Sequence, residues 1–557
     1  METIAMEKWV DMFLQGFDSW TEWRRLDYPV LSPPAAAITG TGVPVRNGYG
    51  GLVPTQNKVS YDAAVAAHFA LSVVLPRAGN IGGGGFAVIH TSKGEAATLD
   101  FREIAPLSAT KEMFIKKNDD QTVSSLTSKS ASGVPGSVKG MWNLYLKYGS
   151  RKVSWSDLLT PAILLADTGF FITEKLSQEL NSNSSNFTMQ NPLGCGPFCE
   201  NTSWKPGTRI VQNVLARTLE GIRDFGPDYF YSGPIALELK KQGYFSLADM
   251  ASYRVHWREP LMGNYLGWEV ITMPPPSSGG LALLQFLWGA ERKANTMQDI
   301  QGAKSYHDFT ELARIIYEDR ARYLGDPDYM TFATDELLDS NYLNDRFSMI
   351  NPEKAGKSPD LIATKSKESM ETTHFSILDK EGNAVSITTT LNASYGSKRW
   401  VSGFFMNNEM DDFSISPGVP NQFGLIGFEA NAIAPGKRML SSMTPTILVK
   451  GDEKVVLGTP GGSTIITNVF QVIRRFVKFK EPLQQAVNAK KIHAQAWPNI
   501  IFLEEGSYDK KVLRQLKRKG HKIEFKTQIG RFQAVSNTES AADIFRTGDS
   551  SGRVIHY

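Results

Sequence analysis

The segment 371–396, which reads ETTHFSILDKEGNAVSITTTLNASYG, constrains the fold of this chain more than any other stretch. Two runs of alternating apolar and polar residues flank a turn at 379–382, and this pattern predicts a β-hairpin. The first strand would open with Thr372 and Thr373, directly after Glu371. Because β-branched residues suit a pleated strand, the threonine pair alone indicates no more than a strand start.

The segment 61–90 predicts a buried helix followed by a strand. Residues 61–75 are alanine-rich and apolar on all sides, and glycines 82–85 separate them from a strand at 86–90. A phosphate-binding loop needs the opposite order, with a strand before the glycines and a helix after them. The glycine run therefore indicates close packing of the backbone against a neighbouring element.

The next strand, at 97–101, leads into Arg102, which has two interpretations. An arginine beside Asp100 is commonly a surface or salt-bridged residue. Its guanidinium fork is also the side chain best suited to hold a carboxylate in bidentate fashion.

Apolar spacing predicts further helices along the chain. They lie at 155–167, 210–223, 281–288, 305–323 and in the basic run 510–522, whose charges we assign to a solvated helix face. Residues 341–370 are lysine-rich and weakly patterned, so we expect an exposed connector there.

Composition excludes several classes of protein. Apolar residues make up 41% of the chain and charged residues 21%, as in one large globular body. A net charge of +3 argues against a nucleic-acid-binding protein, which concentrates positive charge. No run of 18 apolar residues is present, so we expect no transmembrane anchor. The first residues also lack the basic and apolar regions of a secretory signal.

Cys195 and Cys199 are the only cysteines, and they lie in a segment, 181–207, that we expect to be a polar loop. A local disulfide is plausible there, and a metal site is not, because no further Cys or His pair is nearby. Glycosylation sequons at Asn183, Asn186 and Asn201 point with the cysteines to export, whereas the missing signal points against it.

The second half of the chain carries an acidic cluster and a glycine turn. Glu409, Asp411 and Asp412 could serve in acid–base catalysis or hold an ammonium group, but they offer too few oxygen ligands for calcium. The proline- and glycine-rich segment 417–435 is long enough to form a lid. A predicted strand at 454–457 runs into glycines 458–462 and then a helix, an order that presents backbone N–H groups to an anion.

Together these segments resemble the gamma-glutamyltransferase family of the N-terminal nucleophile hydrolase superfamily, with most similarity to its bacterial-type members. The resemblance runs from about residue 61 to 499. The matching motifs are PRAGNIGGGGF (76–86), LDFREIAP (99–106), MPPPSSGG (273–280), RARYLGDPDY (320–329), ETTHFSILDKEGNAVSITTTLN (371–392), NNEMDDF (407–413), RMLSSMTPT (438–446) and GTPGGS (458–463).

The resemblance implies an α+β fold, a four-layer αββα sandwich. It also implies a precursor that cuts itself between Glu371 and Thr372. Residues 61–371 would form the large-subunit portion and 372–557 the small-subunit portion, joined in one body as a heterodimer, with 1–60 a divergent N-terminal segment. No cofactor or metal would be needed, because the free α-amine of Thr372 can act as the base for its own hydroxyl.

The family's site residues carry over to matching positions of this chain. Thr372 would be the nucleophile, and Thr390 would bond its hydroxyl. The α-carboxylate of the substrate would be held by Arg102, Ser441 and Ser442, the α-ammonium by Asn392, Glu409 and Asp412, and the oxyanion by backbone donors of Gly461 and Gly462. The substrates would be glutathione and related γ-glutamyl compounds, with water, amino acids or peptides as acyl acceptors. The scarce histidines would take no part, and we expect His374 to be structural.

Two alternatives remain open. One is an acylase on the same scaffold that cleaves glutaryl-type amides, and the other is a non-catalytic relative that does not mature. Residues 35–60 depart from the family pattern, as does the C-terminal end GDSSGRVIHY. Phe423 stands where bacterial-type members often have a tyrosine that bonds the asparagine matching Asn392. The family and the cysteine pair suggest an extracellular protein, without a visible signal.

Overall fold

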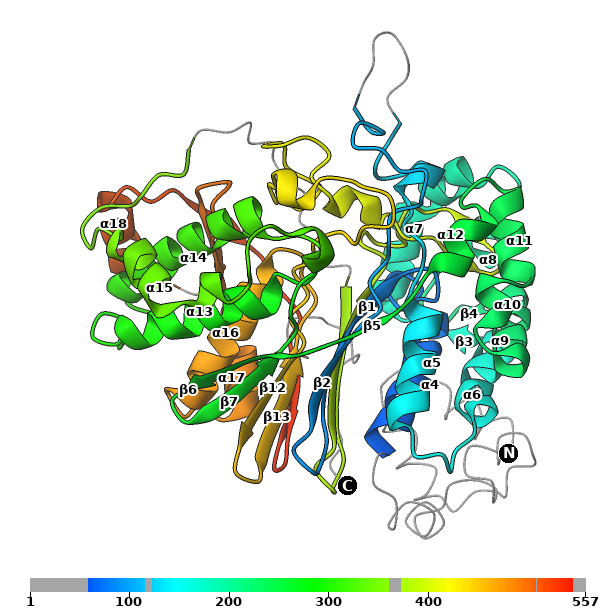
Figure 1. The fold of residues 1–557 in the computed structure, drawn as a ribbon, viewed down its shortest axis with the longest axis horizontal. Helices are drawn as coiled ribbons and strands as arrows, with labels where there is room; N and C mark the ends of the chain where they lie inside the picture. The colour runs from blue at the N-terminus through cyan, green and yellow to red at the C-terminus, as the bar shows by residue number, and fades with distance from the viewer. Residues whose placement is uncertain are drawn as a thin grey trace.

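Two antiparallel sheets face each other between helical layers in the computed structural model of this protein (Figure 1). The structure describes residues 59–115, 123–201, 203–299, 301–359, 372–506 and 508–543. The predicted αββα sandwich is confirmed.

The first sheet combines strands from both sides of Thr372. Its order is β5–β2–β1–β9–β8, and every neighbouring pair is antiparallel. The strands are β1 (Gly84–His90), β2 (Ala96–Asp100), β5 (His256–Arg258), β8 (Thr372–Leu378) and β9 (Ala384–Thr390).

The second sheet also draws on both portions of the chain. Its order is β18–β17–β13–β12–β7–β6, again antiparallel throughout. The strands are β6 (Leu261–Tyr265), β7 (Trp268–Thr272), β12 (Thr446–Lys450), β13 (Glu453–Gly458), β17 (Gln533–Ser536) and β18 (Ser540–Ala542).

Each sheet has its own helical cover (Figure 1). The first is covered by α4 (Val59–Val74), α5 (Ser137–Tyr148), α6 (Trp155–Thr168) and α9 (Asn213–Phe225), and the second by α13 (Gly279–Arg292), α14 (Ala303–Tyr323), α16 (Thr464–Val477) and α17 (Leu483–Asn488). Two hydrophobic cores result. One joins the first helical layer to β9 residues such as Ile387, and the other joins Phe86 and Val88 of β1 to the second sheet and its helices.

Shorter elements complete the described ranges. They are β3 (Phe170–Phe171), α7 (Glu174–Gln190), α8 (Pro197–Glu200), β4 (Arg209–Ile210), α10 (Asp228–Tyr231), α11 (Pro234–Lys241), α12 (Leu247–Ser252), α15 (Ser340–Ser348), β10 (Trp400–Val401), β11 (Phe404–Phe405), β14 (Ile492–His493), β15 (Ile501–Glu504), α18 (Lys510–Arg518) and β16 (Ile523–Lys526). None of the helices within the described ranges has both the length and the hydropathy to cross a bilayer.

The predicted hairpin is confirmed as β8 and β9, with Thr372 opposite Thr390 and Leu378 opposite Ala384. The interpretation of the glycine run is also confirmed. A Cβ added to Gly83 would lie 2.1 Å from the carbonyl oxygen of Thr390, and one added to Gly85 would lie 2.4 Å from that of Thr388. Only glycine lets β1 approach the end of β9 this closely.

The prediction of a polar loop over 181–207 is wrong in its first part. Residues up to Gln190 belong to helix α7, which the Thr173 side chain caps by accepting the N–H of Leu176. Leu176, Leu180 and Phe187 bury one helical face, and this sparse apolar stripe is hidden in the sequence among asparagines and serines. Cys195 and Cys199 form a disulfide just beyond this helix, and Cys199 lies in the short helix α8 (Pro197–Glu200), so the loop prediction is wrong there too.

The expected connector at 341–370 is also partly wrong, because α15 occupies its start. Residues 360–371, which include Glu371, lie outside the described residues, as do 1–58 and the C-terminal GDSSGRVIHY.

Candidate active site

Thr372 opens β8 at the edge of the first sheet, and its side chain is buried. Side chains two apart share a face of a strand, so Thr372 faces the same way as His374, whose ring packs against Gly458 at the end of β13. Across the ladder, the Thr390 hydroxyl accepts the N–H of Asn392 at 2.8 Å. No hydrogen bond joins the Thr372 and Thr390 hydroxyls among the described residues.

Among the described residues, His374 makes no hydrogen bond to either threonine of this pair. Its ring nitrogens lie 2.8 Å from Thr388 Oγ1 and 2.9 Å from Ser376 Oγ. Burial lowers the pKa of His374 to about 3, so the ring is neutral and fills space between the two sheets.

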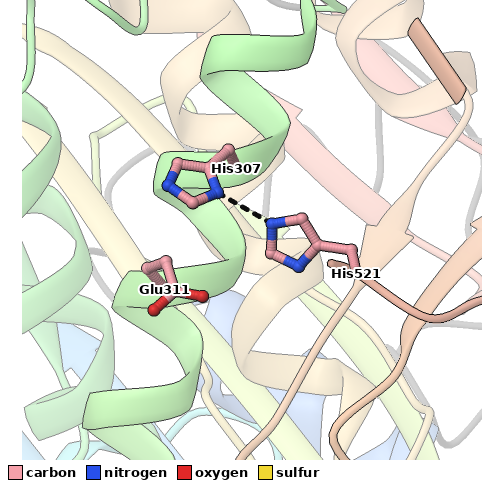
Figure 2. Close-up of side chains that lie close together, drawn as sticks. All are labelled: His307, Glu311 and His521. Carbon is pink, nitrogen blue, oxygen red and sulfur yellow. Dashed lines mark hydrogen bonds between the residues drawn. The ribbon is translucent and has the colours of Figure 1, made fainter. Parts of the chain in front are cut away.

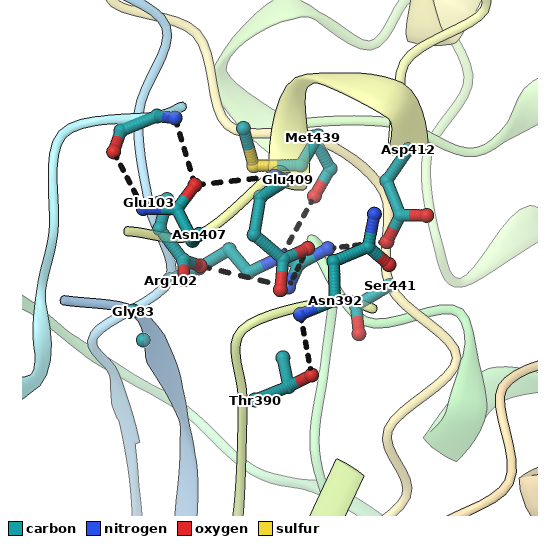
Figure 3. Close-up of polar contacts among 12 residues, drawn as sticks. Gly83, Arg102, Glu103, Thr390, Asn392, Asn407, Glu409, Asp412, Met439 and Ser441 are labelled. Atoms are coloured by element: carbon teal, nitrogen blue, oxygen red, sulfur yellow. Dashed lines mark hydrogen bonds and ion pairs between the residues drawn. The ribbon is translucent and has the colours of Figure 1, made fainter. Parts of the chain in front are cut away.

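Arg102 is fully buried and lies among three carboxylates (Figure 3). Its guanidinium nitrogens lie 2.7 Å from Glu409, 2.6 Å from Asp412 and 3.5 Å from Glu103. The first interpretation of Arg102, a surface or salt-bridged residue, holds in its salt-bridged form, and the fork for a substrate carboxylate stays a prediction. The cluster brings the predicted carboxylate-binding residue and two predicted ammonium-binding residues into direct contact.

The charges in this cluster do not balance, because three acids share one guanidinium. Burial, opposed by Arg102, raises the pKa of Glu103 to about 7 and also raises the pKa values of Glu409 and Asp412. The three carboxylates in turn raise the pKa of Arg102, although burial opposes this. A cationic group entering the site would restore the balance.

Asparagines hold the strand ends around this cluster. The Asn392 amide donates to the carbonyl oxygen of Asn408 at 2.9 Å. Asn407 donates to the carbonyl oxygens of Gly82 and Gly133, and its own oxygen accepts the N–H of Glu409 (Figure 3). The acidic residues therefore have a rigid base.

Ser441 and Ser442 lie against the MPPPSSGG segment. The N–H of Ser441 donates to the carbonyl oxygen of Pro276 at 2.9 Å, and Ser278 donates its N–H and hydroxyl to the carbonyl oxygen of Ser441. The MPPPSSGG segment therefore has a structural role, because its serines form hydrogen bonds with the backbone around Ser441 and Ser442.

The glycine turn between β13 and α16 contains Gly461 (φ 139°) and Gly462 (φ 53°). No described residue accepts a hydrogen bond from the N–H of either glycine. Free N–H groups in such a turn can stabilise an oxyanion. The face shared by Thr372 and His374 points toward Gly458, where this turn begins.

The predicted lid, 417–435, is tied to both ends of the site. Asn421 donates to Asp412 at 3.0 Å, and the N–H of Gln422 donates to Asp411 at 3.0 Å. The Phe423 ring covers the glycine turn, since a Cβ added to Gly462 would lie 2.9 Å from it. Phe423 has no hydroxyl to bond the site, so the polar links between the lid and the site come from Asn421, from the backbone of Gln422 and from Asn431, which donates to the carbonyl oxygen of Asp412 at 2.7 Å.

A second cluster, His307, Glu311 and His521, lies away from this site in α14 and after α18 (Figure 2). These residue types can bind a metal, but their atoms already have partners. His307 Nε2–H donates to the carbonyl oxygen of Asn351, so its Nδ1 accepts from His521 at 2.8 Å. Glu311 accepts from Arg314 and from the N–H of Gly356. We interpret the cluster as a hydrogen-bonded contact between the two portions of the chain.

Comparison with known protein families supports the interpretation of the Thr372 site. Residues 55–553 match the family model described as gamma-glutamyltranspeptidase. The chain belongs to this family. Residues 1–50 match a second model, described as starch-binding associating with outer membrane, over a minor part of the chain.

Curated gamma-glutamyltranspeptidase relatives extend over most of the chain. The glutathione hydrolase proenzyme of Pseudomonas aeruginosa is 41% identical over 88% of this chain and 89% of its own length. The Escherichia coli proenzyme is 39% identical over 85% of this chain and 83% of its own. An acylase ACY 1 proenzyme from Pseudomonas is 30% identical over 90% of this chain and 90% of its own length.

Solved structures give the same fold. A cephalosporin acylase from Bacillus halodurans is 25% identical, with a TM-score of 0.74 over 87% of this chain and 88% of its own. The Helicobacter pylori gamma-glutamyltranspeptidase is 38% identical, with a TM-score of 0.50 over 59% of this chain and 93% of the matched chain.

Some residues of this gamma-glutamyltranspeptidase site were not singled out from the sequence. Glu103, Asn407 and Asn421 contact predicted site residues, and Arg320 contacts Ser442. Glu103, Asn407 and Arg320 each lie within a motif that matches the family, so the motifs could have indicated them. Asn421 lies in the predicted lid, outside the matching motifs, and had no such signal.

Proposed function

We propose that this protein is a self-processing γ-glutamyl hydrolase and transpeptidase that acts on glutathione and other γ-glutamyl compounds. The observation that carries the proposal is the Arg102 cluster next to the end of β9, where Asn392 bonds to Asn408 and Thr390 pairs with Thr372. Arg102 can bind the α-carboxylate of a free amino-acid end, and the surrounding carboxylates can bind its α-ammonium. The names of the curated relatives support the same substrate class.

Maturation would begin with attack of the Thr372 hydroxyl on the carbonyl carbon of Glu371. The C–N bond breaks, the nitrogen takes the hydroxyl proton, and an ester joins the two residues. Water then cleaves the ester, which leaves a carboxylate on Glu371 and both a free amine and a free hydroxyl on Thr372. The product is a heterodimer of two chains from one precursor.

In turnover, the α-amine of Thr372 accepts the hydroxyl proton while the oxygen attacks the γ-carbonyl carbon of the substrate. The N–H groups of Gly461 and Gly462 stabilise the oxyanion, and removal of one such donor costs on the order of 3 kcal/mol. The leaving amine takes a proton as its bond breaks. Water, or the amine of an amino acid or peptide, then releases the γ-glutamyl group from the ester.

Substrate recognition exchanges ion pairs inside the cluster. The α-carboxylate takes up donors of Arg102 together with Ser441 and Ser442, while the α-ammonium binds Glu409, Asp412 and Asn392. Because the amino-acid end carries one charge of each sign, the total charge of the cluster does not change on binding. This avoids burying an uncompensated charge.

A glutaryl-type acylase is the second candidate, because two acylases share this sequence pattern or fold. A glutaryl group has the carboxylate but lacks the amine. It would leave the carboxylate groups around Arg102 without a cationic partner, so we expect the γ-glutamyl anilide to be preferred over the glutaryl anilide.

Intact mass spectrometry of freshly purified protein tests the proposal. We expect two chains, the second beginning at Thr372, and turnover of a chromogenic γ-glutamyl anilide. The variant Thr372→Ala should remain one chain and turn over nothing. An uncut wild-type chain that persists for days would support the non-catalytic alternative instead.

A further inference from the structure

Arg320 is a second buried arginine beside the substrate site, and it has no acidic partner within ion-pair distance among the described residues. It lies on α14 and is 5% exposed. Its Nε donates to Ser278 Oγ at 2.9 Å and its Nη2 donates to Ser442 Oγ at 3.3 Å. Burial lowers the pKa of Arg320 to about 10, so the guanidinium stays charged at neutral pH. Burying a charge without a counterion at ion-pair distance costs free energy.

The positive charge of Arg102 is already shared among Glu103, Glu409 and Asp412. A substrate α-carboxylate adds one more negative charge to this region. Arg320 is a buried guanidinium near the serine pair with no carboxylate of the described residues within ion-pair distance, although the charge of Asp412 acts on it from farther away. The charge distribution therefore places a second positive charge, besides Arg102, behind Ser442.

The hydroxyl oxygens of Ser441 and Ser442 both act as hydrogen-bond acceptors in this structure. Ser442 Oγ accepts from Arg320, and Ser441 Oγ accepts from the N–H of Met443 at 3.1 Å. Because each serine oxygen already accepts one hydrogen bond, each serine hydroxyl can donate its hydrogen to a carboxylate oxygen of the substrate. A cationic donor also polarises the hydroxyl it contacts, which strengthens the next hydrogen bond.

Ser278 connects Arg320 to the backbone of the same pair. It accepts from Arg320 Nε and donates its hydroxyl to the carbonyl oxygen of Ser441 at 2.7 Å. Arg320 thus contacts both serines, one directly and one through Ser278.

We propose that Arg320 is a positioning residue for the substrate α-carboxylate, acting through Ser442 and Ser278 rather than by direct contact. This inference rests on the proposed γ-glutamyl transfer at Thr372. It assigns to α14 the positive charge that makes the serine pair selective for a free carboxylate.

The test compares Arg320→Met with Arg322→Met, a control on the same helix whose side chain is 42% exposed and pairs with Glu318. Two substrate analogues act as competitive inhibitors of γ-glutamyl anilide turnover. Glutaryl anilide keeps the carboxylate and lacks the amine, whereas 4-aminobutyryl anilide keeps the amine and lacks the carboxylate. Intact mass and thermal unfolding establish that each variant is processed and folded.

For Arg320→Met we expect the KM of γ-glutamyl anilide and the inhibition constant of glutaryl anilide to rise about 10- to 100-fold. The inhibition constant of 4-aminobutyryl anilide should stay within about 2-fold of wild type, and Arg322→Met should change none of the three. Equal losses for both analogues would show a structural role and overturn the inference.

Arg320→Lys decides the question if the methionine variant does not fold. It keeps the charge but not the fork, so a smaller loss confined to carboxylate-bearing compounds is expected. Equal losses for both analogues in this variant would likewise overturn the inference. A wild type that turns over no γ-glutamyl anilide would contradict the proposed function and this inference together, whereas an active wild type with unselective Arg320 variants contradicts the inference alone.

Discussion

At the scale of single residues, Glu103 gives the site a dependence on pH. Burial raises the pKa of Glu103 to about 7 from its ordinary value of 4.5. Between these values the folded protein holds a proton that the unfolded chain has released, so this group's contribution to stability is lost as pH rises through the folded pKa. We expect Glu103→Gln to gain stability over wild type between about pH 5 and pH 8, by up to about 3 kcal/mol.

Thermal unfolding of both proteins across that pH range measures this difference. Glu429→Gln is a suitable control, since Glu429 is exposed and pairs with Lys111 at the surface. Because Glu103 also raises the pKa of Glu409, the difference between the two proteins reports the coupled carboxylates around Arg102. Unfolding temperatures of Glu103→Gln and wild type that run parallel from acid to alkaline pH would contradict the role given to Glu103.

At the scale of elements, the Asn421 side chain is a main polar link between the lid and the site. The Asn421 side chain donates to Asp412 and accepts the N–H groups of Phe423 and Leu425. Asn421→Ala should therefore raise the KM of γ-glutamyl anilide about 10-fold and speed hydrogen exchange in 417–428, with a smaller effect on kcat.

Gln422→Ala is the matched control for the lid. The bond from residue 422 to Asp411 is made by its backbone N–H, and its side-chain nitrogen has no hydrogen-bond partner in the described part of the structure. We expect this variant to show wild-type hydrogen exchange in 417–428 and wild-type turnover of γ-glutamyl anilide. Similar effects from both substitutions would mean that the lid responds to any change rather than to loss of the Asn421 bonds.

The sequence predicted elements well where a periodic pattern or a turn signal was strong. The β8–β9 hairpin, helix α4 and the strand–glycine–helix order at β13 and α16 follow from such patterns. Helix α7 was missed because three buried apolar residues among asparagines and serines give a weak stripe. The pairing of Arg102 with Glu409 and Asp412 joins residues more than 300 apart, with |i−j| of 310 for Asp412, so no local pattern could show it.

At the scale of the whole molecule, neither portion of the chain builds either of the two large sheets alone. β1, β2 and β5 precede Thr372 while β8 and β9 follow it, and the second sheet joins β12 to β7 in the same way. A cut before Thr372 leaves every strand pairing intact. We expect the processed protein to keep a native mass near that of the 61.6 kDa chain while denaturing gels separate two chains. Residues 372–557 expressed alone should not fold.

The His307–His521 hydrogen bond crosses between the two portions and should help to hold the processed chains together (Figure 2). Burial and His307 lower the pKa of His521 to about 4, so the His521 ring is neutral above that pH. His521→Ala leaves His307 Nδ1 buried without a donor, which costs about 1–3 kcal/mol. Urea should therefore separate the chains of this variant at a lower concentration, as followed by size-exclusion chromatography, with kcat unchanged.

His521→Gln, which keeps an N–H donor, should recover part of the lost urea resistance. Lys517→Ala, on the exposed face of α18, should lower the urea resistance not at all. Equal urea resistance in the alanine variant and wild type would show that the interleaved strands alone hold the chains together.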